Sequence, residues 1–241
     1  MSTTGSAAGR PTLAQACGEF ASFLRRSPPP PLDALIAGAP RGDGHAVLVL
    51  PAVLRGDPYT AAFRSLLAAI GYRPYGWELG VNIGPTPRLL AGMLDRLQAL
   101  SDRHGPVSLV GFSMGGLFAR WLSHRAGAQV RRVITVCSPF RDPADSLVLP
   151  AAPLLRLWPG LDLPALADEV ARPLAVPGTF LFCRSDGVVN WMRCREPAPG
   201  ADNIEITGRH VLIAQNPEVL RILADVLARP AGRDGDRGVV P

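Results

Sequence analysis

A serine framed by glycines is the feature of this chain that points most directly to chemistry. Residues 111–115 read Gly-Phe-Ser-Met-Gly, after the apolar run Val107–Val110 and before the helix-like segment Leu117–Arg125. Strand, sharp turn and helix in this order predict that Ser113 lies at the tip of the turn with its hydroxyl exposed. Glycines suit the flanking positions because side chains there would collide with the tight turn. Ser113 is therefore the candidate nucleophile, and an ordinary surface turn is the alternative.

A serine nucleophile needs an imidazole that takes its proton, and the chain has four histidines. His210 follows the last strand-like run and precedes the final helix-like segment, so we expect it at the carboxyl edge of a sheet. His45 begins a strand, His104 lies in a loop and His124 lies in a helix-like segment, where hydrogen-bonded structural roles are expected. We predict that His210 is the general base.

The base needs an acid that holds its tautomer and stabilises its charged form. Asp186 stands where the strand-like run Phe180–Cys183 turns into Gly187, although an aspartate before a glycine is also common in ordinary turns. Asp142, Asp162 and Asp168 have no neighbouring strand that would fix them. We therefore predict that Asp186 is the acid.

Ester chemistry through a serine also needs hydrogen-bond donors for the oxyanion of the tetrahedral intermediate. One predicted donor is the backbone N–H of Met114, which follows the nucleophile. The other is expected in the loop after the first strand, most plainly at the backbone N–H of Val53. Main-chain groups would perform this role, so the side chains at both positions mainly shape the pocket.

Alternating strand and helix patterns predict how these residues are positioned. The predicted strands are 45–50, 74–79, 107–112, 130–137, 179–183 and 204–207. Helical spacing of apolar residues links them, so we expect a mainly parallel sheet of about six strands with helices on both faces. A further helix is predicted over 12–26, with Ala16, Phe20, Phe23 and Leu24 on its apolar face.

The predicted organisation is an N-terminal helix and proline-rich arm over 1–40, one α/β domain over 41–230, and a disordered tail over 231–241. The alternation breaks at about 141–177, a stretch rich in leucine, proline and alanine. It is too long for a turn and too apolar for a solvated loop, so we expect a short helical cap over the site. The candidate substrate-pocket residues are Trp77, Leu154, Leu155, Trp158 and Trp191, each of which is equally compatible with a core position.

Composition excludes some classes of protein. Hydrophobic residues make up 47% of the chain, which is typical of a globular protein. The net charge of +5 comes from scattered arginines without aromatic interleaving, so nucleic acid is not an expected partner. No apolar run is long enough for a transmembrane segment.

Residues 1–20 lack the pattern of a secretory signal, and we expect a cytoplasmic protein. The four cysteines show no metal-binding spacing, so we expect no metal site. We expect four reduced thiols, while a Cys183–Cys194 bridge would require an oxidising compartment.

These motifs together resemble the α/β-hydrolase superfamily, in particular its compact bacterial lipase- and esterase-like members. The matching segments are 48–51, 110–116, 134–140, 185–189 and 208–210. The resemblance implies the triad Ser113, Asp186 and His210 and no cofactor. Two departures are visible: Ala52 replaces a usual glycine of the oxyanion loop, and the first two strands of the full fold are absent.

The expected function is hydrolysis of a hydrophobic acyl or aromatic carboxylic ester through an acyl-enzyme. A thioesterase, a transacylase or a lactone-forming enzyme would use the same triad, because these activities differ in acceptor and pocket shape. A haloalkane dehalogenase is disfavoured because its chemistry needs a carboxylate at position 113. The alternative from another class is a non-catalytic binding protein that retains the three residues. The expected partner is a small hydrophobic ester or thioester.

Overall fold

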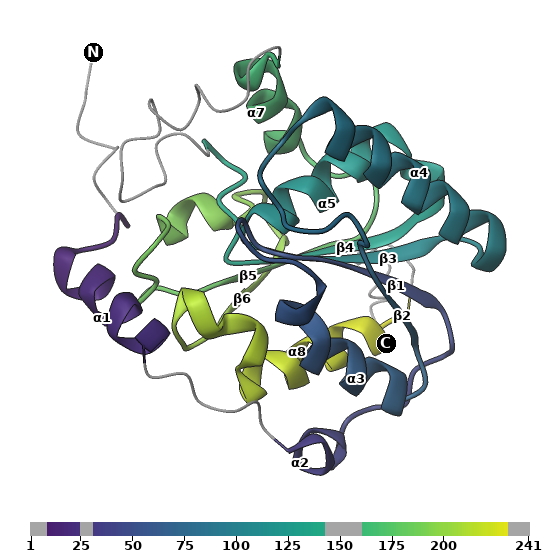
Figure 1. The fold of residues 1–241 in the computed structure, drawn as a ribbon, viewed down its shortest axis with the longest axis horizontal. Coiled ribbons are helices and arrows are strands. Elements are labelled where there is room, and N and C mark those ends of the chain that lie inside the picture. The colour runs from purple at the N-terminus through teal and green to yellow at the C-terminus, as the bar shows by residue number, and fades with distance from the viewer. Residues whose placement is uncertain (1–8, 25–30, 143–160, 231–241) are drawn as a thin grey trace, which may run out of the picture.

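Six parallel strands form the centre of the molecule in a computed structural model that describes residues 9–24, 31–142 and 161–230 (Figure 1). The strands are β1 (Ala46–Leu50), β2 (Arg73–Gly76), β3 (Val107–Phe112), β4 (Val130–Val136), β5 (Gly178–Phe182) and β6 (Asp202–Glu205). Their order in the sheet is β2-β1-β3-β4-β5-β6, and every neighbouring pair is parallel. The predicted six-stranded parallel sheet is confirmed.

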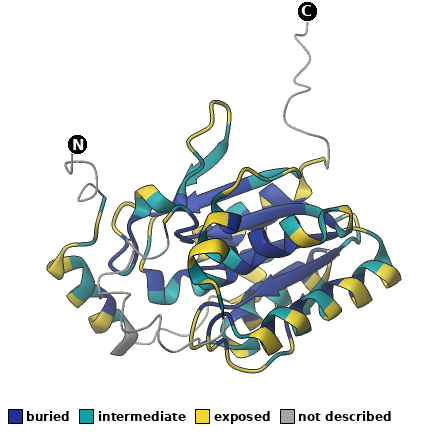
Figure 2. Cartoon of the chain, turned by 90° about the horizontal axis from the view of Figure 1, so that it is seen from above, coloured by how far each residue is buried: buried dark blue, intermediate teal, exposed yellow. Residues whose placement is uncertain are grey.

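Helices cover both faces of this sheet (Figure 1). One face carries α4 (Pro87–His104), α5 (Met114–Arg125) and α7 (Leu163–Ala171), and the other carries α2 (Leu32–Ile36), α3 (Ala61–Ala69) and α8 (Pro217–Ala228). All residues of β1 and β3 are buried, because apolar helices pack on both sides of them (Figure 2). The continuous apolar runs of the sequence arise from this two-sided burial.

The helix α4 shows how sequence signals set an element that flanks the site. The Thr86 side chain accepts a hydrogen bond from the Leu89 backbone N–H, and Pro87 occupies the first turn. Buried leucines and a methionine follow at spacings of three or four residues, and the helix ends before Gly105, whose φ is 75°. The predicted amphipathic helix therefore forms where its caps and its apolar stripe agree.

The N-terminal helix α1 (Leu13–Leu24) differs from its predicted orientation. Phe20, which helical spacing places on the apolar face, has an exposed fraction of 66%, so this part of the apolar face is not packed against the domain. Glu19 is buried instead, with 4% of its surface exposed. Polar contacts to the loops after β5 and β6 set this orientation, as described below.

Four short 3₁₀ helices complete the described elements: η1 (Asp57–Thr60), η2 (Gly127–Gln129), η3 (Trp191–Cys194) and η4 (His210–Gln215). Of the predicted cap, residues 143–160 lie outside the described residues, whereas α7 packs against α5. Within the described ranges, no helix is both long and apolar enough to cross a membrane. All four cysteines fall in these ranges as free thiols, and Cys137, Cys183 and Cys194 are buried.

Candidate active site

The turn between β3 and α5 holds Ser113 in an unusual backbone conformation. Its φ is 53° and its ψ is −119°, a region that residues with a side chain rarely occupy. Such a conformation costs about 1–3 kcal/mol and persists only where the surroundings impose it. The Ser113 N–H donates to the Val136 carbonyl at 2.8 Å, which ties the turn to the end of β4. The predicted strand, turn and helix are all present.

The two glycines of the motif are required by close backbone contacts. A Cβ atom added to Gly111 would lie 2.2 Å from the Gly115 carbonyl oxygen. A Cβ atom added to Gly115 would lie 2.3 Å from the Leu50 carbonyl oxygen and 2.8 Å from that of Pro51. The turn therefore packs directly against the loop after β1, which is the loop that was predicted to hold the second oxyanion donor.

The structure brings the three predicted side chains together at the carboxyl edge of the sheet. The Ser113 Oγ lies 2.9 Å from the His210 Nε2, and the His210 Nδ1 lies 2.7 Å from the Asp186 Oδ2. Ser113 follows β3, Asp186 follows β5 and His210 begins η4 after β6. The exposed fractions are 8% for Ser113, 7% for His210 and 2% for Asp186, so all three residues are buried, including the serine that the sequence predicted to be exposed.

Backbone amides orient the acid. The Asp186 Oδ1 accepts hydrogen bonds from the N–H groups of Val188 at 2.8 Å and Val189 at 2.9 Å. These bonds fix the orientation of the carboxyl group and leave its Oδ2 for the imidazole. Asp186 therefore faces the Nδ1 side of His210.

The charges around His210 favour its protonated form. Burial lowers the pKa of the imidazole, but the charge and hydrogen bond of Asp186 and the charge of Glu19 outweigh burial, and the net pKa is raised. A histidine whose protonated form is stabilised in this way suits the transfer of a proton from a serine hydroxyl.

The other three histidines lie elsewhere in the parallel topology. His45 precedes β1, His104 ends α4 and His124 lies near the end of α5, so all three are near the amino edge of the sheet. His45 pairs with Asp43 and contacts the Ser108 hydroxyl at 2.8 Å. His104 contacts the Tyr75 hydroxyl at 2.7 Å.

Two of the alternative acids have local structural roles. Asp142 forms an ion pair with Arg193 at 3.6 Å. The Asp162 side chain caps α7 by accepting from the Ala165 N–H at 3.0 Å. Neither interaction brings these carboxylates to the imidazole.

A buried asparagine braces the loop after β1. Asn82 has no exposed surface, and its Nδ2 donates to the Pro51 carbonyl at 2.8 Å. Its backbone carbonyl accepts from the Leu54 N–H at 2.7 Å, and its N–H donates to the Arg55 carbonyl at 2.8 Å. Val53 lies within this braced loop. Sequence reasoning missed Asn82, because an asparagine in a loop carries no signal for a partner about 30 residues away.

A buried thiol lies beside the acid and the base. The potential ligand atoms of Cys137, Asp186 and His210 lie within 4.8 Å of one another, the one such group found among the described residues. Burial raises the pKa of the Cys137 thiol, and the Asp186 charge raises it further. An ion there would break the hydrogen bond between the Asp186 Oδ2 and the His210 Nδ1, so the contacts fit a proton-transfer pair better than a metal site.

The predicted pocket residues have different surroundings. Trp77 is fully buried in the core beside α4, where its indole N–H donates to the Gly80 carbonyl at 2.9 Å, so it offers no surface to a substrate. Trp191 is partly buried and stacks on Phe182, with ring centroids 5.5 Å apart. Leu154, Leu155 and Trp158 lie outside the described residues.

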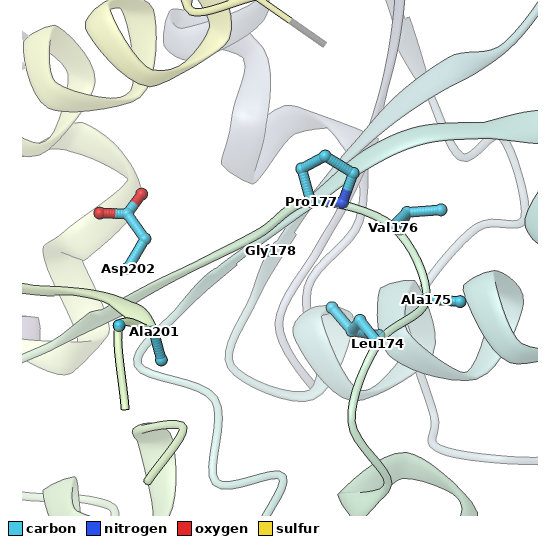
Figure 3. A pocket seen from close by; sticks show the side chains of 8 residues that line it. Leu174, Ala175, Val176, Pro177, Gly178, Ala201 and Asp202 are labelled. Atoms are coloured by element: carbon cyan, nitrogen blue, oxygen red, sulfur yellow. The ribbon is translucent and has the colours of Figure 1, made fainter. Parts of the chain in front are cut away.

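A separate pocket of about 390 Å³ lies at the amino ends of β5 and β6, lined by residues 174–178 and 200–202 (Figure 3). It is at the opposite edge of the sheet from Ser113, because parallel strands place all their carboxyl ends together.

The fold is that of the α/β-hydrolases. A metagenome-derived lipolytic enzyme matches with a TM-score of 0.60 at 14% identity, covering 78% of this chain and 95% of that one. A pyrethroid hydrolase matches with a TM-score of 0.55 at 18% identity, covering 78% and 98%. An extracellular α/β-hydrolase from a Paenibacillus species matches with a TM-score of 0.53 at 14% identity, covering 77% and 100%.

No family model matches the sequence, and no curated protein matches it. Structural likeness over about 78% of the chain therefore shows the fold alone. The α/β-hydrolase fold that the resemblance implies is confirmed.

Proposed function

We propose that the protein is a serine hydrolase that cleaves carboxylic esters of hydrophobic acyl or aromatic compounds through an acyl-enzyme. The observation that carries this proposal is the hydrogen-bonded series from the Ser113 Oγ to His210 and on to Asp186, with the serine on a strained turn. The arrangement supplies a nucleophile, a base and an orienting acid in one site.

In the first half of the proposed reaction, the Ser113 Oγ attacks the ester carbonyl carbon while the His210 Nε2 takes the hydroxyl proton. The oxyanion receives hydrogen bonds from the N–H groups of Met114 and Val53. Collapse of the tetrahedral intermediate breaks the bond to the alcohol oxygen, and the protonated His210 gives that oxygen its proton.

In the second half, His210 takes a proton from water, and the resulting hydroxide oxygen attacks the acyl carbon. Collapse of this intermediate breaks the bond to the Ser113 oxygen, which recovers its proton from His210 as the carboxylic acid leaves. Asp186 remains ionised throughout and stabilises the imidazolium.

The test is labelling with a fluorophosphonate probe, followed by mass spectrometry of the modified peptide. We expect the wild-type protein to be labelled at Ser113 and Ser113→Ala to be unlabelled and to lose about 10⁴–10⁶ in kcat on ester substrates. Labelling that persists in Ser113→Ala would remove Ser113 as the nucleophile. A folded wild-type protein that is neither labelled nor active would instead favour the non-catalytic binding protein.

A substrate panel distinguishes hydrolysis from the related activities that use the same triad. p-Nitrophenyl esters of increasing acyl length should be cleaved faster as methylenes are buried, at about 0.8 kcal/mol each, until the pocket is filled. Higher kcat/KM on matched acyl thioesters would favour a thioesterase. Formation of a new ester or lactone, measured by mass spectrometry with an alcohol acceptor present, would favour acyl transfer.

A further inference from the structure

A buried carboxylate on α1 touches both loops that carry the acid and the base. The Glu19 Oε1 accepts hydrogen bonds from the backbone N–H of His210 at 2.9 Å and of Gly187 at 3.2 Å. The Glu19 Oε2 accepts one from the Val211 N–H at 3.1 Å. Gly187 directly follows Asp186, so a single side chain links the two loops through their main chains.

The rest of α1 is fitted to the same two loops. A Cβ atom added to Gly187 would lie 2.5 Å from the Gln15 carbonyl oxygen, so only glycine permits this approach of the helix. The Gln15 side chain donates to the Arg184 carbonyl at 3.3 Å. On the other loop, Arg209 lies over Gly18, where an added Cβ atom would be 2.6 Å from its guanidinium nitrogen. Because of these contacts, the face of α1 that carries Glu19 is turned toward the two loops, and Glu19 is buried.

A carboxylate is a costly group to bury, and three charge-assisted hydrogen bonds offset that cost here. None of the three bonds goes to the Asp186 or His210 side chains, so Glu19 leaves the proton-transfer series intact. It acts on that series in two ways. Its hydrogen bonds fix the separation of the two loops, and its negative charge favours the imidazolium form of His210.

We propose that Glu19 is a positioning residue of the active site, which holds the loop after β5, with Asp186, against the loop after β6, with His210. This inference rests on the proposed serine hydrolase function. It makes the N-terminal helix part of the catalytic unit, although α1 precedes the α/β domain that the sequence indicates.

The test compares Glu19→Gln and Glu19→Ala with two controls. Asp225→Asn removes an exposed carboxylate on α8, and Phe20→Ala changes the exposed neighbour on the same helix. Glu19→Gln keeps the shape of the side chain and one acceptor oxygen but loses the charge. Thermal unfolding is measured for each variant, together with kcat, KM and the pH dependence of kcat/KM on a p-nitrophenyl ester.

We expect Glu19→Gln to lower kcat by roughly 10-fold and Glu19→Ala by roughly 100-fold, with KM nearly unchanged, because the lost bonds position groups that act in the transition state. The acid limb of the pH profile should move to lower pH in Glu19→Gln, since a negative charge that stabilises the imidazolium is gone. The other groups close to the His210 imidazole, which are the Asp186 carboxylate, the Ser113 hydroxyl and the Cys137 thiol, are unchanged in this variant. Both controls should retain the wild-type profile.

A Glu19→Gln protein with lower thermal stability but an unchanged kcat and pH profile would overturn the proposal, because Glu19 would then be structural only. The downfield proton resonance of the His210 Nδ1–H gives a readout that does not depend on any substrate. Its titration midpoint should fall in Glu19→Gln, and an unmoved midpoint would also count against the proposal. A wild-type protein without ester activity whose midpoint still falls in Glu19→Gln would refute the proposed hydrolase function and leave the role of Glu19 supported.

Discussion

Ser113 combines backbone strain with a short hydrogen-bonded path to a buried carboxylate. Its positive φ projects the hydroxyl toward His210, and the surrounding contacts with β4 and with the loop after β1 impose that conformation. This strain lowers the stability of the fold, and an ordinary surface turn has no need of it. Its presence at the residue with an imidazole 2.9 Å away is what favours a nucleophile over the ordinary turn.

The first prediction distinguishes His210 from the other histidines. His210→Ala should lower kcat about as much as Ser113→Ala, because the members of such a group act as one unit. His124→Ala serves as the control and should keep kcat within about threefold, since His124 lies on α5 away from Ser113. Steady-state kinetics on folded variants check this. An active His210→Ala protein together with an inactive His124→Ala protein would contradict the assignment.

The second prediction concerns pH. The base must be neutral to accept the Ser113 proton, so activity is lost as His210 becomes protonated. Because the pKa of His210 is raised, the acid limb of kcat/KM should have its midpoint above the ordinary histidine value of about 6.5, with activity increasing through that range. A pH series with an ester that has no ionisable group measures it. A midpoint below that value would show that burial outweighs the two carboxylates.

The positions of the loops that follow the strands are set by contacts with other elements. The loop after β1 is held by Asn82, which comes from the connection between β2 and α4. Its Nδ2 binds the Pro51 carbonyl, while its Oδ1 accepts from the Gly84 N–H at 3.0 Å. The proposed donor at Val53 therefore relies on a second loop for its position.

Replacing Asn82 by alanine should lower kcat by tenfold or more, because a displaced oxyanion donor loses part of the roughly 10²–10³ that one donor contributes. Asn203→Ala is a matched control. The Asn203 side chain similarly bonds the backbone of Glu196, at 2.8 and 2.9 Å, but lies on β6. Both variants should be less stable by about 1–3 kcal/mol, and only Asn82→Ala should lose kcat. Equal kcat values in the two variants would show that Asn82 has no effect on the site.

A buried arginine joins parts of the whole molecule that are distant in sequence. Arg120 on α5 has no exposed surface and donates to the carbonyls of Val170 at 2.5 Å and Arg172 at 2.6 Å. Its guanidinium lies 3.6 Å from the Glu196 carboxylate and 3.8 Å from the centre of the Phe140 ring. Burial lowers the pKa of Arg120 to about 10, so it remains charged at neutral pH.

Arg120→Met should destabilise the protein by about 3–5 kcal/mol, because two backbone carbonyls lose their buried donor and the half-buried Glu196 loses its ion-pair partner. For a chain of this size the expected fall in Tm is roughly 6–20 °C, measured by circular dichroism or calorimetry. Arg125→Met is the comparison, since Arg125 pairs with Glu169 at 2.7 Å but its side chain is 55% exposed. That variant should change Tm by only a few degrees. Similar losses in both variants would show that burial does not set the contribution of Arg120.

The sequence by itself determined the sheet and its parallel character, and it singled out Ser113, Asp186 and His210, which the structure brings within hydrogen-bond distance of one another. These are local signals, because strand and helix periods, glycines at fixed offsets and chain order can all be read along the chain. Parallel strands then place their carboxyl ends at one edge, so residues after β3, β5 and β6 were expected to lie together. The predicted boundaries differ from the observed ones by one to a few residues, as for β2, which ends at Gly76.

Only the tertiary structure decided which side chains support those three residues. Helical spacing alone placed Phe20 on the apolar face of α1, whereas three backbone N–H groups on distant loops favour burial of Glu19. In the same way, Asn82 and Arg120 bond backbone groups whose positions depend on the folded chain. No periodic pattern in the sequence marks a polar side chain that is buried by long-range hydrogen bonds. Its partners are determined by the topology of the fold and not by neighbouring residues in the chain.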